Sequence, residues 1–164
     1  MRRMRLFIKK SKILKTVVFL IVIIFVFFIL LKKNKNREIA VFNQLTKELY
    51  FEKKVKTGDI LSFEWEHSFE HICWKEFYKI TDEKNFELFT IAVEGFGAGI
   101  PAEMDCTYRF EDGMIYMENI KGSIFKEFNW INSQNQLKKI KINDIEFLKG
   151  KDLPEREKIK LLLK

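Results

Sequence analysis

The sequence predicts an all-β fold class in which a single N-terminal transmembrane helix is followed by a β-sandwich or a small open β-barrel. The first observation is an uncharged apolar run, TVVFLIVIIFVFFILL, at residues 16–31. The second is the pattern from residue 38 onward, where short runs of Ile, Val, Phe, Tyr and Thr are separated by Gly, Asp and Asn. Short runs with turn residues between them are typical of strands in a sandwich or a barrel.

Residues 13–31 are predicted to form a transmembrane signal-anchor helix. These nineteen residues span about 28 Å as an α-helix, which matches a hydrocarbon core of about 30 Å. A cleaved signal peptide is the alternative, but its apolar region is shorter and ends in small residues, whereas KKNKNRE follows here. We therefore favour an uncleaved anchor. The expected domains are a basic cytoplasmic N-terminus (1–12), the helix (13–31), a linker (32–37) and a β domain (38–164).

The charge distribution gives the orientation of the predicted helix and argues against nucleic-acid binding. Of the 30 Lys and Arg residues, eleven lie within residues 1–37, which leaves nineteen basic against 23 acidic residues, a net charge of −4, from residue 38 onward. Seven of the eleven precede the apolar run at residues 16–31 and four follow it, which favours a cytoplasmic N-terminus and an extracytoplasmic β domain. A nucleic-acid binder would carry positive charge on its folded domain. We expect a bacterial inner-membrane protein whose residues 13–31 contact lipid.

Turn signals divide the β domain into eleven expected strands. Glu111-Asp112-Gly113 is typical of a hairpin, because glycine tolerates a positive φ. A helical turn is expected near residues 153–158. The expected strands cover residues 39–43, 47–55, 60–68, 72–80, 86–94, 104–110, 114–120, 124–131, 137–142, 145–148 and 158–163.

Alternation along three of these strands predicts which side chains face the core. Two polar residues, His67 and Glu76, fall on faces that are otherwise apolar, and buried polar groups need partners. The tryptophans on these faces are more simply core residues than a ligand cage. The predicted core faces comprise Leu61, Phe63, Trp65 and His67; Ile72, Trp74, Glu76, Tyr78 and Ile80; and Phe89, Ile91 and Val93.

Two short motifs carry a family resemblance. They are His67-Ser68-Phe69-Glu70, followed by Glu76, and Gly97-Ala98-Gly99-Ile100-Pro101. The pair resembles the domain-of-unknown-function-1850 family of bacterial proteins, whose members typically show His-Ser-Val-Glu, a later Glu and Gly-Ala-Gly-Leu-Pro. The match is best over residues 49–110 and departs at residues 71–74, where family members often have Thr-Pro-Val. The resemblance implies an association with TRAP transporters of the TAXI type, but no mechanism.

His67 and Glu76 lie on adjacent expected strands and can meet inside the sheet. A His–carboxylate pair can hold a small ligand or a metal ion, and a polar network that stabilises a turn is the simpler alternative. His67 and His71 would be about 13 Å apart on an extended strand, which disfavours a zinc site. Ser68 and His67 point to opposite faces of a strand, which disfavours a hydrolase.

The remaining candidates also have structural interpretations. Arg109 is a candidate partner for Glu76, Glu70 or a ligand carboxylate, or a member of an ion pair between strands. The glycine-rich motif lacks the third glycine of a dinucleotide fingerprint, so it suits a tight loop or a close approach of a ligand or partner. Cys73 and Cys106 are a candidate disulfide pair or two buried thiols.

The sequence therefore favours a non-enzymatic, membrane-anchored accessory protein associated with a TRAP transporter subunit. No catalytic residue, cofactor or metal is expected. The alternative is a small-ligand or metal-binding module around His67 and Glu76. The candidate binding residues are His67, Ser68, Glu70, Glu76, Gly97, Gly99, Pro101 and Arg109.

Overall fold

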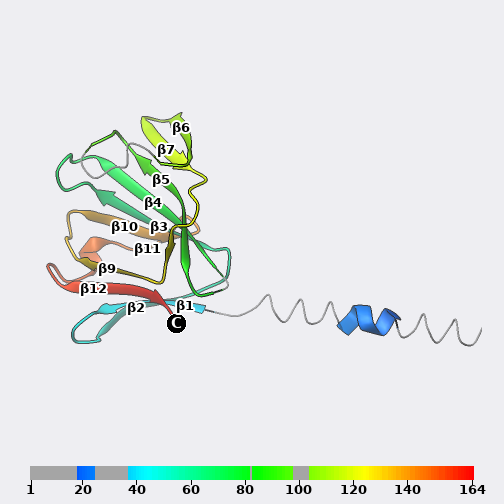
Figure 1. Ribbon diagram of the computed structural model, residues 1–164. Coiled ribbons are helices and arrows are strands. Elements are labelled where there is room, and N and C mark those ends of the chain that lie inside the picture. Colours follow the sequence, from blue (N-terminus) through cyan, green and yellow to red (C-terminus); the bar gives the residue numbers. More distant parts are fainter. Residues whose placement is uncertain (1–17, 25–36, 82, 98–103) are drawn as a thin grey trace, which may run out of the picture. The chain divides into compact units, whose positions relative to one another are not determined.

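The computed structural model describes residues 18–24, 37–81, 83–97 and 104–164 (Figure 1). Residues 18–24 are helical, and their seven side chains are apolar and exposed. The rest of the predicted transmembrane helix, residues 13–17 and 25–31, lies outside the described residues. No helix in the described ranges combines the length and the apolar character that a membrane crossing requires. The β domain, Asn36–Lys164, is a compact unit of its own.

The described part of this unit consists of short strands, as the alternating runs predict. Their positions agree with all eleven expected strands, three of them to the residue. One expected strand, 124–131, is divided in two. The strands are β1 (Arg37–Asn43), β2 (Leu49–Val55), β3 (Ile60–Glu66), β4 (Cys73–Ile80), β5 (Phe86–Val93), β6 (Thr107–Glu111), β7 (Met114–Glu118), β8 (Ile124–Phe125), β9 (Glu127–Ile131), β10 (Leu137–Ile142), β11 (Ile145–Leu148) and β12 (Lys158–Leu163).

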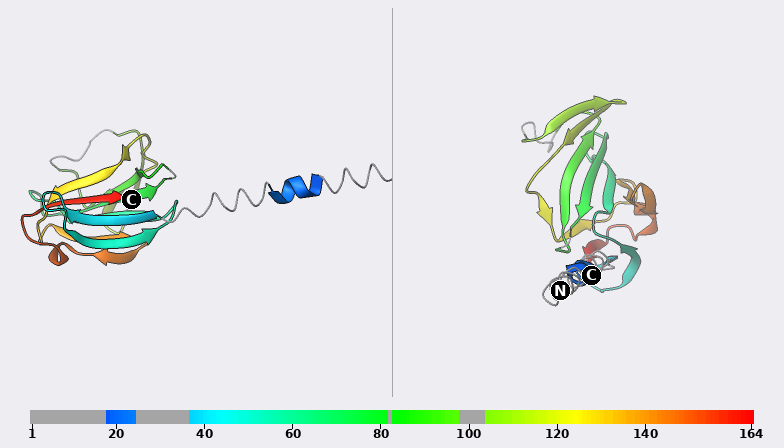
Figure 2. Two further views of the ribbon diagram at one scale, coloured as in Figure 1. Left: turned by 90° about the horizontal axis from the view of Figure 1, so that it is seen from below. Right: turned by 90° about the vertical axis from the view of Figure 1, so that its right-hand side faces the viewer.

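These strands form two antiparallel sheets that do not close into a barrel. One sheet has the order β2-β1-β12-β9, and the other has the order β11-β10-β3-β4-β5-β7-β6, with β8 paired to β5. The first and last strands are neighbours: β1 pairs with β12 in the register Ile39↔Leu163, so the two ends of the domain lie side by side (Figures 1 and 2). The expected β-rich fold is confirmed as two antiparallel sheets, and they do not close into a barrel.

Aromatic side chains from both sheets fill the core. Phe63 of β3 is 2% exposed, and its ring centroid lies 4.9 Å from that of Phe128 on β9 of the other sheet. Phe128 also lies against Tyr78 and Phe86, with centroid distances of 4.7 and 4.9 Å. Because β3 and β4 supply one wall of this core, the side chains that alternate inward along them determine what the core contains.

Two details differ from the sequence predictions. Phe89 is only partly buried, and the core position belongs to Leu88, because a bulge pairs Phe77 with Thr90 and Tyr78 with Leu88. The extra residue of a bulge shifts the alternation by one. The helical turn expected near residues 153–158 is instead a 3₁₀ turn, η1, at Gly150–Asp152.

Candidate functional site

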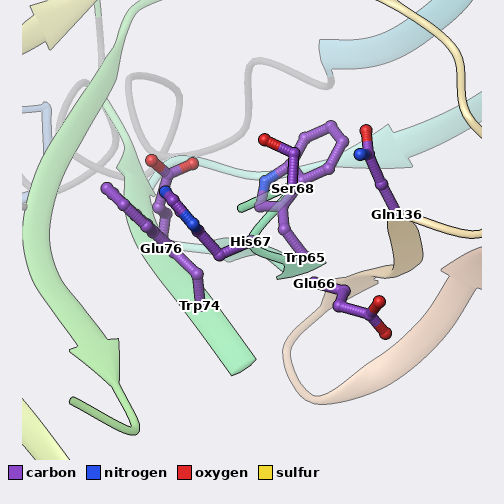
Figure 3. A pocket seen from close by; sticks show the side chains of 7 residues that line it. All are labelled: Trp65, Glu66, His67, Ser68, Trp74, Glu76 and Gln136. Carbon is purple, nitrogen blue, oxygen red and sulfur yellow. The ribbon is translucent and has the colours of Figure 1, made fainter. Parts of the chain in front are cut away.

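A pocket of about 210 Å³ opens where β3 and β4 meet the turn between them (Figure 3). We call it the Glu76 pocket. Three of the candidate residues line it, His67 and Ser68 from the turn and Glu76 from β4, and Gln136, which is distant in sequence, lines it from the loop before β10. Its lining comprises Trp65, Glu66, His67, Ser68, Trp74, Glu76 and Gln136.

Strand register explains why a carboxylate reaches this pocket. Glu76 is opposite Phe63, and Trp74 is opposite Trp65, so these four side chains lie on the same face of the sheet. On that face alternation would place an apolar residue at position 76, between Trp74 and Tyr78. The sequence places a carboxylate there instead, against the aromatic core.

Burial raises the pKa of Glu76 above its ordinary value. Hydrogen bonding from Tyr78 and Trp65 opposes this effect, because it favours the charged form. The Trp74 indole acts in the same direction from a poorer geometry, since its Nε1 atom has no hydrogen-bond partner. Burial and the neighbouring carboxylate also raise the pKa of Tyr78. No Lys, Arg or His among the described residues forms an ion pair with Glu76, so this carboxylate lacks a neutralising cation.

His67 lines the same pocket and is held by the turn that follows β3. Its backbone N–H donates to the Ile72 carbonyl at 2.8 Å, and its Nδ1 atom accepts the Glu70 N–H at 3.2 Å. Its ring stacks on Trp74 with a centroid distance of 5.7 Å and an interplanar angle of 7°. The predicted meeting of His67 and Glu76 therefore takes the form of a shared pocket. The hydrogen bonds of the described residues do not join them directly.

Ser68 lies in the turn and also lines the pocket. The described residues show no hydrogen bond between Ser68 and either histidine: Nδ1 of His67 accepts the Glu70 N–H, and Nδ1 of His71 lies 3.3 Å from Glu66 Oε1. His71 has a φ of 55°, and this left-handed residue completes the turn. In the described ranges no three His, Cys, Asp or Glu residues are placed to hold a metal ion.

The two family motifs meet at Glu70 and Gly97. A Cβ atom on Gly97 would lie 2.7 Å from Cγ of Glu70, so only a glycine lets the Glu70 side chain pack here without moving. This contact joins the turn after β3 to the loop after β5. Gly99 and Pro101 lie outside the described residues.

The structure does not bring Arg109 to the other candidate residues. Its Nη2 atom lies 2.9 Å from Glu118 Oε1 on the neighbouring strand, it also pairs with Glu111, and its guanidinium lies 4.0 Å from the centroid of the Tyr116 ring. The strand order places β5 and β7 between β6, which carries Arg109, and β4, which carries Glu76. The ion pair between strands, the simpler of the two interpretations, is confirmed.

Cys73 and Cys106 are both free thiols and partly buried. Burial raises the pKa of the Cys73 thiol. The disulfide between them stays a prediction.

A larger groove of about 560 Å³ lies beside Cys73, and each of its two lysines pairs with a glutamate of the same lining. Lys138 lies 2.6 Å from Glu66, and Lys139 lies 3.3 Å from Glu64. The Glu94 carboxylate accepts the Cys73 N–H at 2.8 Å. Both lysines of this groove are therefore already engaged, and Glu94, its remaining carboxylate, is exposed to solvent.

Sequence reasoning missed two features of the site. Nothing in the sequence pattern pointed to Gln136. Its position depends on a long-range contact, in which its own backbone carbonyl accepts the Glu66 N–H at 2.8 Å. Trp65 and Trp74 were assigned to the core. Alternation placed both on the face of Glu76, and that coincidence of two indoles with a carboxylate was the signal that could have identified the pocket.

Comparison with known proteins associates one family with this chain. The family model described as "Domain of unknown function (DUF1850)" matches residues 61–147, more than half of the 164 residues. The match begins in β3 and ends in β11, and it contains every residue that lines the Glu76 pocket. No curated protein and no solved structure matches the chain.

Proposed function

This chain belongs to the DUF1850 family, and we propose that it is a membrane-anchored, non-enzymatic accessory protein whose β domain binds a small ligand in the Glu76 pocket. The observation that carries the proposal is the partly buried Glu76 carboxylate, which lines a pocket and has no neutralising cation in the described part of the chain. Burying such a group disfavours folding unless a partner compensates for it. A carboxylate with a raised pKa that lines a pocket is typical of a functional site, here a ligand-binding one.

Two observations support the anchor. Residues 16–31 are uncharged and apolar, and the described helical residues 18–24 expose all seven of their side chains. A helix that is apolar on every side suits a lipid environment. With seven basic residues before the span, the proposed orientation places the N-terminus in the cytoplasm and the β domain outside the bacterial inner membrane.

The proposed protein partner is a subunit of a TRAP-type solute transporter, as the family resemblance suggests. Two exposed phenylalanines favour a protein contact. Phe69, 75% exposed, and Phe96, 53% exposed, belong to the two segments that the Glu70–Gly97 contact brings together. Exposed aromatic side chains are typical anchors of protein interfaces.

Purification of the full-length protein from its native membrane tests the partner. A transporter subunit is expected to co-purify with the wild type. It is expected to be absent when the double variant Phe69→Ser/Phe96→Ser is purified in the same way. Phe110→Ser is the matched control, because Phe110 is 73% exposed on β6 but lies outside both motifs. Repeated absence of any transporter subunit from the wild-type preparation would refute the association.

A thermal-shift screen of the full-length protein tests ligand binding. Organic cations, organic anions and neutral polar compounds are compared with and without Glu76→Gln. At least one class is expected to raise the melting temperature of the wild type more than that of the variant. If no class changes it, the ligand-binding function is wrong.

A further inference from the structure

We propose, building on the ligand-binding function above, that the Glu76 pocket takes a small organic ammonium cation that also carries a hydroxyl or carbonyl oxygen. The charge of the lining is the first argument. Among the described residues, neither Lys nor Arg lines the pocket, and the two carboxylates of the lining are Glu66 and Glu76. Glu66 is neutralised by Lys138 and contacts His71, and its carboxylate points away from that of Glu76 (Figure 3). The uncompensated charge of the pocket is therefore that of Glu76, which attracts a cation and repels an anion.

The aromatic lining is the second argument. Trp65 and Trp74 line the pocket together with Glu76. A second hollow of about 110 Å³, which we call the inner hollow, shares Trp65 and Glu76 with it. The inner hollow is lined by Phe63, Trp65, Glu76, Phe128, Asn129 and Trp130. Indole and phenyl rings around a carboxylate are the lining that proteins use for ammonium groups, because the rings attract a cation and its methyl or methylene groups find apolar contacts.

Unpartnered donors are the third argument. Among the described residues, the buried Nε1 atoms of Trp74 and Trp130 form no hydrogen bond of normal geometry, although the Trp74 indole lies close enough to Glu76 to favour its charged form. Buried donors are usually paired, and leaving one unpaired is unfavourable. An oxygen on the ligand that accepts the Trp74 N–H would satisfy one of them, so the cation is expected to carry a hydroxyl or carbonyl group.

The size of the pocket limits the ligand. Its volume of about 210 Å³ is smaller than the roughly 300–1,000 Å³ of sites for drug-sized molecules. An amino alcohol or its N-methylated form has the required charge, oxygen and size.

Tryptophan fluorescence gives a direct test. All three tryptophans of the chain, Trp65, Trp74 and Trp130, line the pocket or the inner hollow, so the emission reports on this site without a label. Full-length protein in dodecyl maltoside, whose headgroup is uncharged, is titrated with choline chloride, with ethanolammonium chloride and with 3,3-dimethylbutan-1-ol, the neutral isostere of choline. Sodium chloride at matched concentration controls for ionic strength.

The expected result is a saturable change with choline or ethanolammonium and binding at least about tenfold weaker for the neutral isostere. Glu76→Gln is expected to weaken cation binding by a similar factor. Glu146→Gln is the matched control, because Glu146 is exposed on β11 and pairs with Lys149 at 3.1 Å. Equal affinity of the isostere, or unchanged affinity of Glu76→Gln, would overturn the cation assignment.

A second variant tests the role of the oxygen and keeps the proposal testable if Glu76→Gln folds poorly. Trp74→Phe keeps an aromatic ring but removes the N–H, so it is expected to weaken choline binding clearly more than tetramethylammonium binding, which loses only the difference between an indole and a phenyl contact. Equal loss for both cations would overturn the hydrogen bond to the ligand oxygen.

The outcomes separate this inference from the function on which it depends. If a neutral or anionic compound binds with saturation to the wild type and does not bind to Glu76→Gln, ligand binding is supported and the assignment of a cationic ligand is refuted. No saturable change with any compound would refute both.

The ammonium group can come from a free amine or from a lipid headgroup. Full-length protein in nanodiscs of phosphatidylglycerol alone is compared with protein in nanodiscs that also contain phosphatidylethanolamine. If the headgroup of phosphatidylethanolamine occupies the site, added ethanolammonium changes the emission only in the nanodiscs of phosphatidylglycerol alone, where the site is free. If a free amine is the ligand, both kinds respond alike. A response in neither kind would overturn the proposal.

Discussion

Replacing Phe63 by alanine is expected to destabilise the β domain strongly, because this ring joins the two sheets. Phe63 is 2% exposed, and its ring packs against Trp65, Tyr78, Phe128 and Trp130 at centroid distances of 5.7, 6.0, 4.9 and 6.1 Å. Removing a buried phenylalanine ring leaves a cavity, and Phe→Ala changes at such sites destabilise by about 3–5 kcal/mol. For a domain of this size the loss corresponds to a fall in melting temperature of about 10–20 °C.

Urea unfolding followed by tryptophan emission measures this loss, since all three tryptophans lie within the β domain. Phe63→Leu, which keeps most of the apolar volume, is expected to cost about 1–2 kcal/mol. Phe110→Ala is the matched control, because Phe110 is 73% exposed and its truncation is expected to change stability by less than about 0.5 kcal/mol. A loss at Phe63 below about 1 kcal/mol, or an equal loss at Phe110, would show that the sheets do not depend on this contact.

Three further changes test other parts of the structure. Because burial raises the pKa of Glu76, the native state holds its proton more tightly than the unfolded state, and the contribution of Glu76 to stability falls as pH rises above about 4.5. Glu76→Gln should match the wild type below that pH and become progressively more stable than it above, and a constant difference across pH in urea titrations would contradict the assignment. Asn132→Ala should destabilise the domain by about 2–3 kcal/mol, because the buried Nδ2 atom donates to the carbonyls of Gly150, Leu153 and Pro154 at 3.0, 3.2 and 3.1 Å. A melting temperature of the variant no lower than that of the wild type would refute this. Gly150→Ala should cost about 1–3 kcal/mol, because its Cβ would lie 2.5 Å from the Leu137 carbonyl oxygen, whereas Gly97→Ala meets only the flexible Glu70 side chain and should be nearly neutral in the same assay.

The pattern of apolar and polar residues was sufficient to place the strands. Period-2 alternation gave the faces of β3 and β4 that meet the other sheet, including the anomalous Glu76, because successive side chains of a strand point to opposite faces. It failed at Phe89, where a bulge inserts one residue and reverses the alternation. A bulge depends on the pairing of two strands, and a single run of residues does not contain that information.

The candidate site shows the same division. The sequence singled out His67 and Glu76, and the β3–β4 hairpin is local enough for their shared pocket to be expected. Arg109 was a reasonable partner for Glu76 only while the strand order was unknown. In the structure two strands separate Arg109 from Glu76, and Arg109 pairs with the nearby Glu118 instead.

By itself, the sequence determined the strands, the faces that they bury and the presence of a carboxylate among core residues, because these follow from periodicity along one short segment. Tertiary structure alone decided that two sheets stack instead of closing into a barrel, and that Gln136 completes a pocket around Glu76. It also decided that Trp130 of the other sheet borders the inner hollow beside this carboxylate. The physical reason is that these arrangements depend on contacts between residues far apart in the chain, whose pairing is selected by the packing of the whole domain.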